Sequence, residues 1–377
     1  MSDNWDTLGL NINLLRGIYS NGFERPSQIQ TQAIPVILSH KDVIAQAQSG
    51  TGKTGAFCIS TLQKCTSEPT LQAIILSPTR ELSIQTHSVF EKLALYTGIK
   101  AQLLIGGISI ENDIKHMSQN KSQVLIGCPG RVLDFLNRNI VPTTDIKLIV
   151  LDEADEILSF GFQTQLYNIF QYLTDKVQVV MFSATIKNEL HDIANKIMVD
   201  PVKLLVKTEM LTLEGISQYY ILFQTDQDKI DALKDLYNFI SMSQSIIYCN
   251  SVKRVIDLYN VLKAQGFPVC CIHSEMEKAE RTNAYTEFKS GKYRVLISSN
   301  VTARGIDIQQ VSTVINFDLP KCVDTYLHRI GRSGRWGRKG VGINFITNYD
   351  TEKMKNIEQH YSTQIKEFPE NYGSLLK

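Results

Sequence analysis

The sequence predicts an α/β protein with two tandem domains, each a parallel β-sheet flanked by helices, joined by a short linker. Short apolar runs rich in β-branched residues alternate with longer stretches of helical periodicity. Consecutive runs are separated by enough chain for a crossover, which favours parallel strands covered on both faces. The alternation begins again in the second half, and 377 residues are enough for about two domains.

The predicted strands form two series, one in each half of the chain. The first series comprises residues 43–45, 73–76, 124–126, 148–151 and 179–182, and the second 246–248, 269–272, 295–297, 314–317 and 341–345. Between them lies a short polar segment. We therefore expect an N-terminal domain over 1–206, a linker over 207–214 and a C-terminal domain over 215–377. Two sheets joined by so short a linker would face each other across a cleft.

Composition narrows the class of protein. Hydrophobic content of 43% and charged content of 20% are typical of soluble globular proteins. No apolar run approaches the roughly 18 residues of a membrane span, and the polar, acidic N-terminus is no secretory signal. The seven cysteines form no Cys-x-x-Cys pair and lie mostly in apolar runs, which predicts buried thiols in a reducing compartment. We expect a cytoplasmic protein, with a nuclear location as the alternative, and a monomeric core.

A glycine-rich loop follows the first predicted strand. Residues 47–54 read Ala-Gln-Ser-Gly-Thr-Gly-Lys-Thr and precede a helical stretch. Glycines let backbone amides point at a polyphosphate, and the helix N-terminus adds a favourable dipole. A chance glycine-rich turn is the alternative, but the strand before and the helix after favour an ATP site. The predicted phosphate-binding residues are Ser49, Gly50, Thr51, Gly52, Lys53 and Thr54.

Carboxylates directly follow the strand 148–151, where open α/β sheets bind ligands. Asp152 is the expected Mg²⁺ carboxylate, together with the Thr54 hydroxyl, and Glu153 is placed to orient or deprotonate the attacking water. An acidic helix N-terminus is the structural alternative. The phosphate loop 98 residues before Asp152 makes the catalytic interpretation the better one.

Positive charge is concentrated late in the second half. Five Lys and Arg residues fall within residues 329–339, between the predicted strands 314–317 and 341–345, so the segment is held inside a fold. A solvated face or a disordered Arg/Gly tail is the alternative. We predict that Arg332 and Arg335 reach the γ-phosphate held by the other domain and stabilise its charge in the transition state. Net charge is only +1, so any grip on nucleic acid must be local.

These elements and others between them resemble the DEAD-box RNA helicases, with residues 152–155 spelling Asp-Glu-Ala-Asp. The resemblance runs from about Trp5 to the C-terminus and implies two RecA-like domains that use ATP and Mg²⁺. It implies that Phe23 stacks on adenine, that Gln30 reads the adenine edge, and that Arg25 and Asp307 contact the nucleotide. It also implies residues that link hydrolysis to strand separation, namely Asp155, Ser183, Thr185 and His328.

The same resemblance implies an RNA path along both domains, through contacts with phosphates and sugars rather than base edges. Within the family, stretches such as 211–216 and 361–365 look most like the translation initiation factor 4A group, and the exon-junction group is nearly as similar. The implied RNA-binding residues are Pro78, Thr79, Arg80, Gly106, Gly107, Pro129, Gly130, Arg131, Asn250, Arg281 and Ser299.

Four departures from the family pattern affect the RNA path. Cys128 stands where Thr is usual, Lys278 where Gln is usual, and Ser299-Asn300 where Thr-Asp is typical. The stretch 273–275 also lacks a customary Gly. None of these positions belongs to the predicted ATP-hydrolysing set, so they bear on RNA affinity and domain closure.

The predicted function is therefore an RNA-stimulated ATPase that locally unwinds short RNA duplexes, working with initiation-factor scaffold proteins. Three other interpretations remain open. One is an ATP-dependent RNA clamp with low turnover, built on the same residues, that works with exon-junction proteins. The second is another role in the family, such as ribosome biogenesis, and the third is a P-loop ATPase that acts on DNA or on no nucleic acid.

Overall fold

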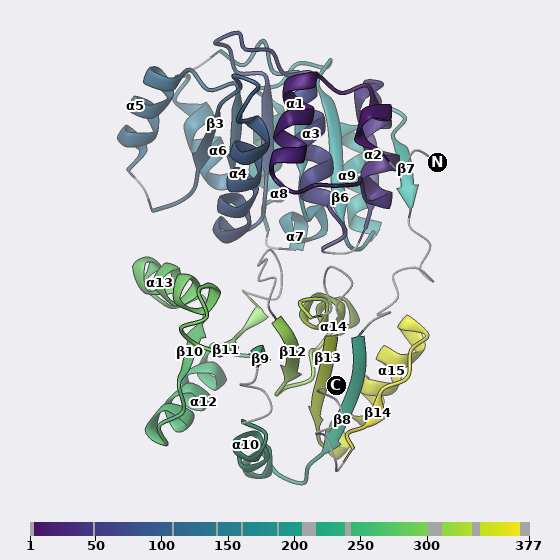
Figure 1. The fold of residues 1–377 in the computed structure, drawn as a ribbon, viewed down its shortest axis with the longest axis vertical. Coiled ribbons are helices and arrows are strands. Elements are labelled where there is room, and N and C mark those ends of the chain that lie inside the picture. The colour runs from purple at the N-terminus through teal and green to yellow at the C-terminus, as the bar shows by residue number, and fades with distance from the viewer. Residues whose placement is uncertain are drawn as a thin grey trace. The chain divides into compact units, whose positions relative to one another are not determined.

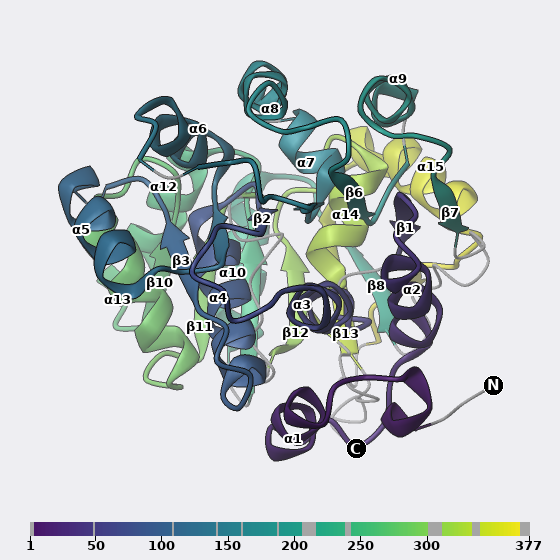
Figure 2. The ribbon, with the colours of Figure 1, turned by 90° about the horizontal axis from the view of Figure 1, so that it is seen from above.

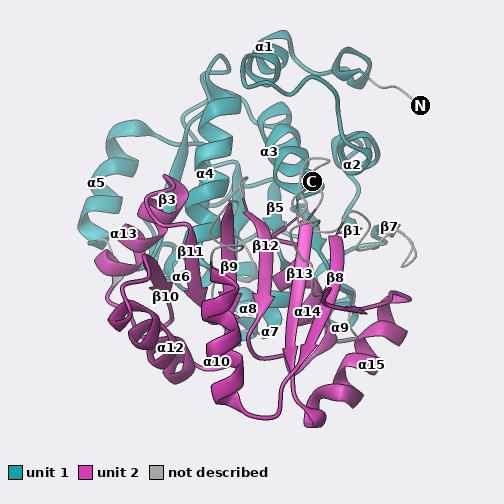
Figure 3. Cartoon of the chain, turned by 60° about the horizontal axis from the view of Figure 1, so that its bottom comes forward, with its two compact units in different colours: residues 1–206 teal, residues 207–377 magenta. Residues whose placement is uncertain are grey.

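The computed structural model describes residues 4–47, 50–107, 109–140, 142–159, 161–186, 188–205, 216–237, 243–300, 311–333 and 340–369. The chain divides into two compact units, residues 1–206 and 207–377 (Figure 3). Each unit contains a sheet with seven described strands (Figure 1). All paired strands are parallel, which confirms the predicted class of two helix-flanked parallel sheets. The expected linker, 207–214, lies outside the described residues.

Strands and helices alternate along unit 1. Its strands are β1 (Val43–Gln46), β2 (Ala73–Leu76), β3 (Ala101–Leu104), β4 (Val124–Gly127), β5 (Leu148–Leu151), β6 (Gln178–Ser183) and β7 (Val202–Leu205). Its helices are η1 (Trp5–Leu8), α1 (Ile12–Ser20), α2 (Gln28–Leu38), α3 (Lys53–Lys64), α4 (Arg80–Ala94), α5 (Ile110–Asn120), α6 (Pro129–Asn137), α7 (Ala154–Ser159), α8 (Gln163–Phe170) and α9 (Asn188–Ile197).

Two apolar layers cover the two faces of this sheet. Alternate strand residues point to opposite faces, so Val43 and Ala45 join one core and Ile44 joins the other. The first core receives α1 to α4 and the second receives α5 to α9. Figure 2 shows α1 to α4 on one side of the unit 1 strands and α6 to α9 on the other. Burial on both faces explains why the central strands read as unbroken apolar runs.

Unit 2 repeats this plan. Its strands are β8 (Ile216–Leu222), β9 (Gln244–Tyr248), β10 (Val269–Ile272), β11 (Val295–Ser298), β12 (Val311–Asn316), β13 (Gly340–Ile346) and β14 (Lys366–Glu367). Its helices are α10 (Asp226–Asp235), α12 (Val252–Ala264), α13 (Lys278–Lys289), α14 (Val323–Ile330), η4 (Asn348–Asp350) and α15 (Thr351–Tyr361). One core receives α13, α14 and α15, and the other receives α10 and α12.

All ten predicted strands are present, with ends that agree to within three residues; the largest difference is at the start of β12, which begins at Val311 rather than at 314. Sequence analysis missed β3, β7, β8 and β14. Of these, β3, β7 and β14 lie at sheet edges, and β8 is only partly buried. Such strands lack the continuous apolar run that marks a strand buried on both faces. Within the described ranges, no helix is long and apolar enough to cross a membrane.

The strand orders decide which loops are neighbours. They are β3-β4-β2-β5-β6-β1-β7 in unit 1 and β10-β11-β9-β12-β13-β8-β14 in unit 2. Since the strands of each sheet are parallel, the loops that follow them all leave from the carboxyl ends of the strands, which we call the carboxyl edge of the sheet. Open α/β sheets bind ligands along this carboxyl edge.

Candidate functional site

The phosphate loop leads from β1 into α3, as predicted. Gly50 and Gly52 have φ angles of +86° and +101°, a region that favours glycine. A Cβ on Gly52 would also lie 2.8 Å from Gln30 Nε2. Gly52 is the N-cap residue of α3 and, having no side chain, makes no capping bond to the first amides of that helix. Thr51 and Thr54 lie in this turn, and Ser49 is outside the described residues.

Lys53 opens α3 and contacts the acidic motif. Its Nζ lies 3.0 Å from Oε1 of Glu153, and the two side chains are only 5% and 4% exposed. Glu153 follows β5 and has a φ of +49°, unusual for a residue other than glycine. Strained backbone of this kind concentrates at functional sites. The structure thus brings together two of the predicted catalytic groups from positions 100 residues apart.

Asp152 is buried beside this pair. Burial raises the pKa of its carboxyl above the usual range, and the neighbouring Glu153 carboxylate adds to the shift, while the Lys53 ammonium opposes it. Among the described residues no donor binds its Oδ1. A buried carboxylate oxygen without a donor is suited to a cation.

Three of the four predicted coupling residues form one hydrogen-bonded group in unit 1, and the fourth, His328, is buried in α14 of unit 2. Thr185 Oγ1 donates to Asp155 Oδ2 over 2.7 Å. Ser183 Oγ donates to the Thr185 carbonyl over 2.6 Å and accepts a longer 3.4 Å bond from the Asp155 amide. Ser183 ends β6, which lies between β5 and β1 in the sheet. The group therefore connects the acidic motif to the strand beside the phosphate loop.

The predicted adenine-reading residues lie beside the phosphate loop. Gln30 is buried; its Nε2 donates to the Gly52 carbonyl over 3.1 Å and its Oε1 accepts from the Ser27 amide over 2.7 Å. Trp5 donates from Nε1 to the Phe23 carbonyl over 2.9 Å and packs edge-on against the Phe23 ring. Arg25 is exposed. The glutamine is thus fixed by the loop that would hold the phosphates.

The RNA candidates of unit 1 lie along the other half of the carboxyl edge, away from the phosphate loop. They follow β2, β3 and β4, which are consecutive in the order β3-β4-β2. Thr79 caps α4, and Arg80 is the first residue of that helix. Arg131, in the first turn of α6, is held by Asp113 through two 3.1 Å contacts. Of the remaining candidates, Pro129 and Gly130 open α6, and Pro78, Gly106 and Gly107 lie in these loops.

Cys128 occupies the N-cap of α6 and makes no capping bond. Its Sγ lies 3.6 Å from Ser83 Oγ, and burial raises the pKa of its thiol. A threonine hydroxyl would be a much stronger capping acceptor. The departure therefore removes a cap as well as a polar group from the RNA candidates.

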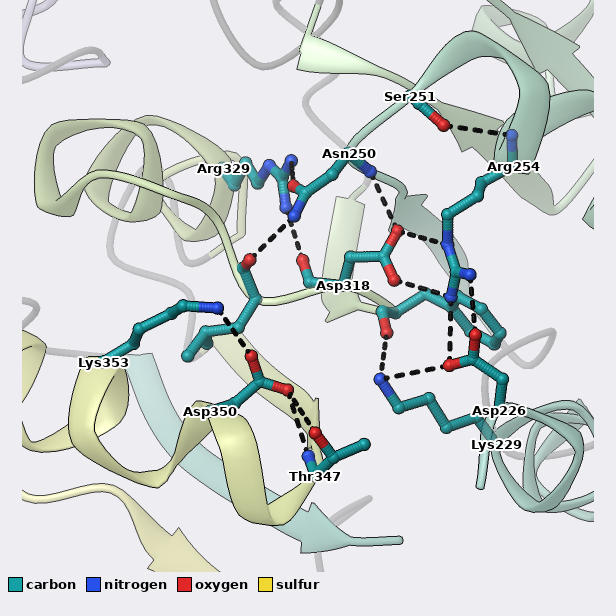
Figure 4. A network of polar contacts seen from close by, with 12 residues as sticks. Asp226, Lys229, Asn250, Ser251, Arg254, Asp318, Arg329, Thr347, Asp350 and Lys353 are labelled. Atoms are coloured by element: carbon teal, nitrogen blue, oxygen red, sulfur yellow. Dashed lines mark hydrogen bonds and ion pairs between the residues drawn. The ribbon is translucent and has the colours of Figure 1, made fainter. Parts of the chain in front are cut away.

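In unit 2 the predicted RNA candidate Asn250 belongs to a polar network at the edge of the sheet (Figure 4). Its backbone N–H donates to Asp318 Oδ2 over 3.0 Å, and its side-chain Oδ1 accepts from Arg329 over 2.7 Å. Asp318 is also paired with Arg254, which bonds Asp226 in turn. The network fixes the loops that follow β9 and β12.

The other second-unit candidates are only partly described. Arg332 is buried just after α14, and its Nε donates to the His328 carbonyl over 3.1 Å. Arg281 and Ser299 are half-buried. Arg335 and Asp307 lie outside the described residues.

Sequence analysis selects Arg332 and Arg335 but passes over Arg329, which the structure places at the centre of the unit 2 network. Arg329 is fully buried in α14. Its spacing was the available signal, because it follows the buried Tyr326 by three residues and shares that inward helix face.

A phosphate loop with a buried lysine–glutamate pair, on one of two tandem parallel α/β units, defines a nucleotide-hydrolysing enzyme of the helicase type. Family models agree: DEAD/DEAH box helicase matches residues 27–193, and the helicase conserved C-terminal domain matches 228–337. The chain belongs to the DEAD/DEAH box helicase family.

Individual relatives cover nearly the whole chain. It is 48% identical to eukaryotic initiation factor 4A of Caenorhabditis elegans over 99% of this chain and 93% of the relative. It is 49% identical to the ATP-dependent RNA helicase eIF4A of Chaetomium globosum over 99% and 94%. Among solved structures, S. cerevisiae Dbp5 bound to RNA and ADP BeF3 has a TM-score of 0.93 at 36% identity, covering 100% of this chain and 98% of that one. Mss116 bound to single-stranded RNA and UDP-BeF has a TM-score of 0.88 at 27% identity, covering 98% and 81%.

Proposed function

We propose that the protein is an ATP-dependent RNA helicase that acts in translation initiation, hydrolysing ATP when RNA is bound and opening short duplexes. The observation that carries this function is the buried Lys53–Glu153 pair beside Asp152. It lies at the same sheet edge as the Thr185–Asp155 bond. Relatives across the full chain are named as initiation factor 4A.

In the proposed reaction Lys53 binds the β- and γ-phosphates, and the first amides of α3 bind the remaining phosphate oxygens. Glu153 orients the attacking water and accepts its proton. Phe23 and Gln30 select adenine. Arg332 and Arg335 stabilise charge on the γ-phosphate, a role that requires the second unit to reach the nucleotide during the cycle.

The donor set fits Mg²⁺. Asp152 Oδ1 is buried without a donor among the described residues, and the Thr54 hydroxyl lies in the first turn of α3. No group of three or more His, Cys, Asp or Glu side chains that could hold a metal occurs in the described ranges. This suits Mg²⁺, which takes one or two protein oxygens and completes its shell with water and phosphate. Bound there, Mg²⁺ would neutralise charge on the β- and γ-phosphates.

RNA is the proposed polymer substrate, held by phosphates and sugars along the loops after β2, β3 and β4 and along those of unit 2. The proposed protein partners are initiation-factor scaffold proteins, and the proposed location is the cytoplasm. Residues 207–214 remain the proposed linker.

A multiple-turnover ATPase assay without polymer, with RNA and with DNA of the same sequence tests the function, together with unwinding of a short RNA duplex. We expect stimulation by RNA alone and ATP-dependent unwinding. Equal stimulation by DNA would favour a DNA-directed ATPase. Tight ATP-dependent RNA binding with almost no turnover would instead favour a clamp of the exon-junction kind.

A further inference from the structure

Arg329 is a buried cation whose hydrogen bonds within the described part of the chain all go to uncharged oxygens. Nε donates to Asn300 Oδ1 over 2.9 Å, and Nη2 donates to Asn300 and Asn250 Oδ1 over 2.6 and 2.7 Å. Nη1 donates to Asn316 Oδ1 over 3.1 Å and to the Asp318 carbonyl over 2.8 Å. No carboxylate is among these acceptors.

The positive charge on Arg329 persists under ordinary conditions. Burial lowers the pKa of this guanidinium to about 10, so it remains protonated near neutral pH. The Asp318 carboxylate is held by Arg254, with Nη2 to Oδ1 at 2.7 Å and Nε to Oδ2 at 2.8 Å (Figure 4). An anion placed close to Arg329 would therefore be stabilised.

The guanidinium also fixes the orientation of Asn300. An arginine side chain only donates hydrogen bonds, so the amide atom that faces it must be oxygen. Two donors of Arg329 converge on that oxygen. The NH2 group of Asn300 is consequently turned away from Arg329, and the residue is exposed.

Asn250 is fixed by Arg329 in the same way but is already engaged on its other side. Its Nδ2 donates to the Leu319 carbonyl over 2.9 Å. Asn300 comes directly after Ser299 at the end of β11, and β11 pairs with β9, which leads to Asn250. Asn250 and Asn300 thus follow adjacent strands at the carboxyl edge of the sheet, and of these two side chains Asn300 is the exposed one.

We propose that Asn300 is a phosphate-binding residue for the RNA strand, with its NH2 group donating to a phosphodiester oxygen and Arg329 acting as the positioning residue behind it. This inference rests on the proposed function. An amide here presents donors to the phosphate, whereas a carboxylate would be repelled by it. The Asp-to-Asn departure is therefore a gain of phosphate affinity rather than the loss of a contact.

The decisive variant is Asn300→Asp. A carboxylate at position 300 would form an ion pair with the buried Arg329 guanidinium, raising the melting temperature by a few degrees, while Kd for RNA would rise on the order of tenfold. A merely structural role for Asn300 would move both quantities in the same sense. Asn356→Asp, which makes the same charge change on an exposed face of α15, is the control and should alter neither.

The assay is fluorescence anisotropy of labelled oligouridine with ADP–beryllium fluoride at several salt concentrations, alongside thermal unfolding. Weaker RNA binding with a higher melting temperature in Asn300→Asp supports the inference. Unchanged or tighter RNA binding, or a lowered melting temperature, overturns it. If the unsubstituted protein binds no RNA, the proposed function fails first. RNA binding that survives undiminished in Asn300→Asp overturns this inference alone.

Discussion

Lys53 Nζ lies 3.0 Å from Glu153 Oε1, so the lysine that would bind the γ-phosphate and the carboxylate that would orient water hold each other. A phosphate reaching Lys53 competes with Glu153 for the same ammonium. Binding of the nucleotide would thereby release the carboxylate for the attacking water. We propose that this pair would link phosphate binding directly to assembly of the catalytic base.

Glu153→Gln should abolish RNA-stimulated ATP hydrolysis while leaving ATP binding measurable. The amide cannot accept a proton, and loss of general-base catalysis typically lowers the rate by about 10²–10⁴. Lys53→Ala should lose both binding and turnover. Steady-state phosphate release and nucleotide titration measure the two effects, with the exposed Lys92→Ala as control. Near-normal turnover in both site variants would refute the catalytic assignment.

Asp152→Asn should raise the thermal stability of the nucleotide-free protein, increasingly so at higher pH. Since the pKa of Asp152 is raised in the folded state, its contribution to stability is present below the unfolded carboxyl pKa. That contribution is lost as pH rises through the higher, folded pKa. The amide does not ionise, so its advantage should grow from about pH 4, near the unfolded carboxyl pKa, up to the folded pKa of about 7.

Melting temperatures across that range measure the effect of Asp152→Asn, with Asp145→Asn at an exposed position as the matched control. The same substitution should abolish hydrolysis. A stability difference between Asp152→Asn and the parent that stays constant with pH would show that folding does not raise the pKa of Asp152.

Thr185→Val should separate hydrolysis from unwinding. The substitution keeps the shape of the side chain but removes the 2.7 Å bond to Asp155, with an expected loss of about 1 kcal/mol in the free energy of unfolding. If this bond transmits the state of the acidic motif to β6, duplex unwinding should fall roughly tenfold while ATPase changes only a few-fold. Parallel unwinding and ATPase assays measure this, and equal losses in both would argue against a coupling role.

Gly127→Ala should destabilise the first unit, because its Cβ would lie 2.1 Å from the Leu104 carbonyl oxygen. Backbone on neighbouring strands cannot move aside freely, so we expect a loss of about 1–3 kcal/mol in the free energy of unfolding. Gly130→Ala is the matched control, since nothing lies within 4 Å of its added Cβ. Denaturant unfolding compares the two, and similar stabilities would contradict the close approach of β3 and β4.

The sequence alone determined the class of fold and the chemistry of the nucleotide site. Buried parallel strands need unbroken apolar runs, and a phosphate loop needs glycines and a lysine at fixed spacing, so both are readable from local order. Edge strands such as β3 and β14 escaped because exposure removes that signal.

Tertiary structure alone decided which distant side chains meet. The sheet order places β6 between β5 and β1, and so lets Thr185 bond Asp155. The tertiary structure also shows that Arg329 is bound to Asn250 and Asn300, whereas Arg332 bonds the His328 carbonyl. Spacing along a chain carries no record of such partners, because they are set by the strand order and by packing between segments far apart in sequence.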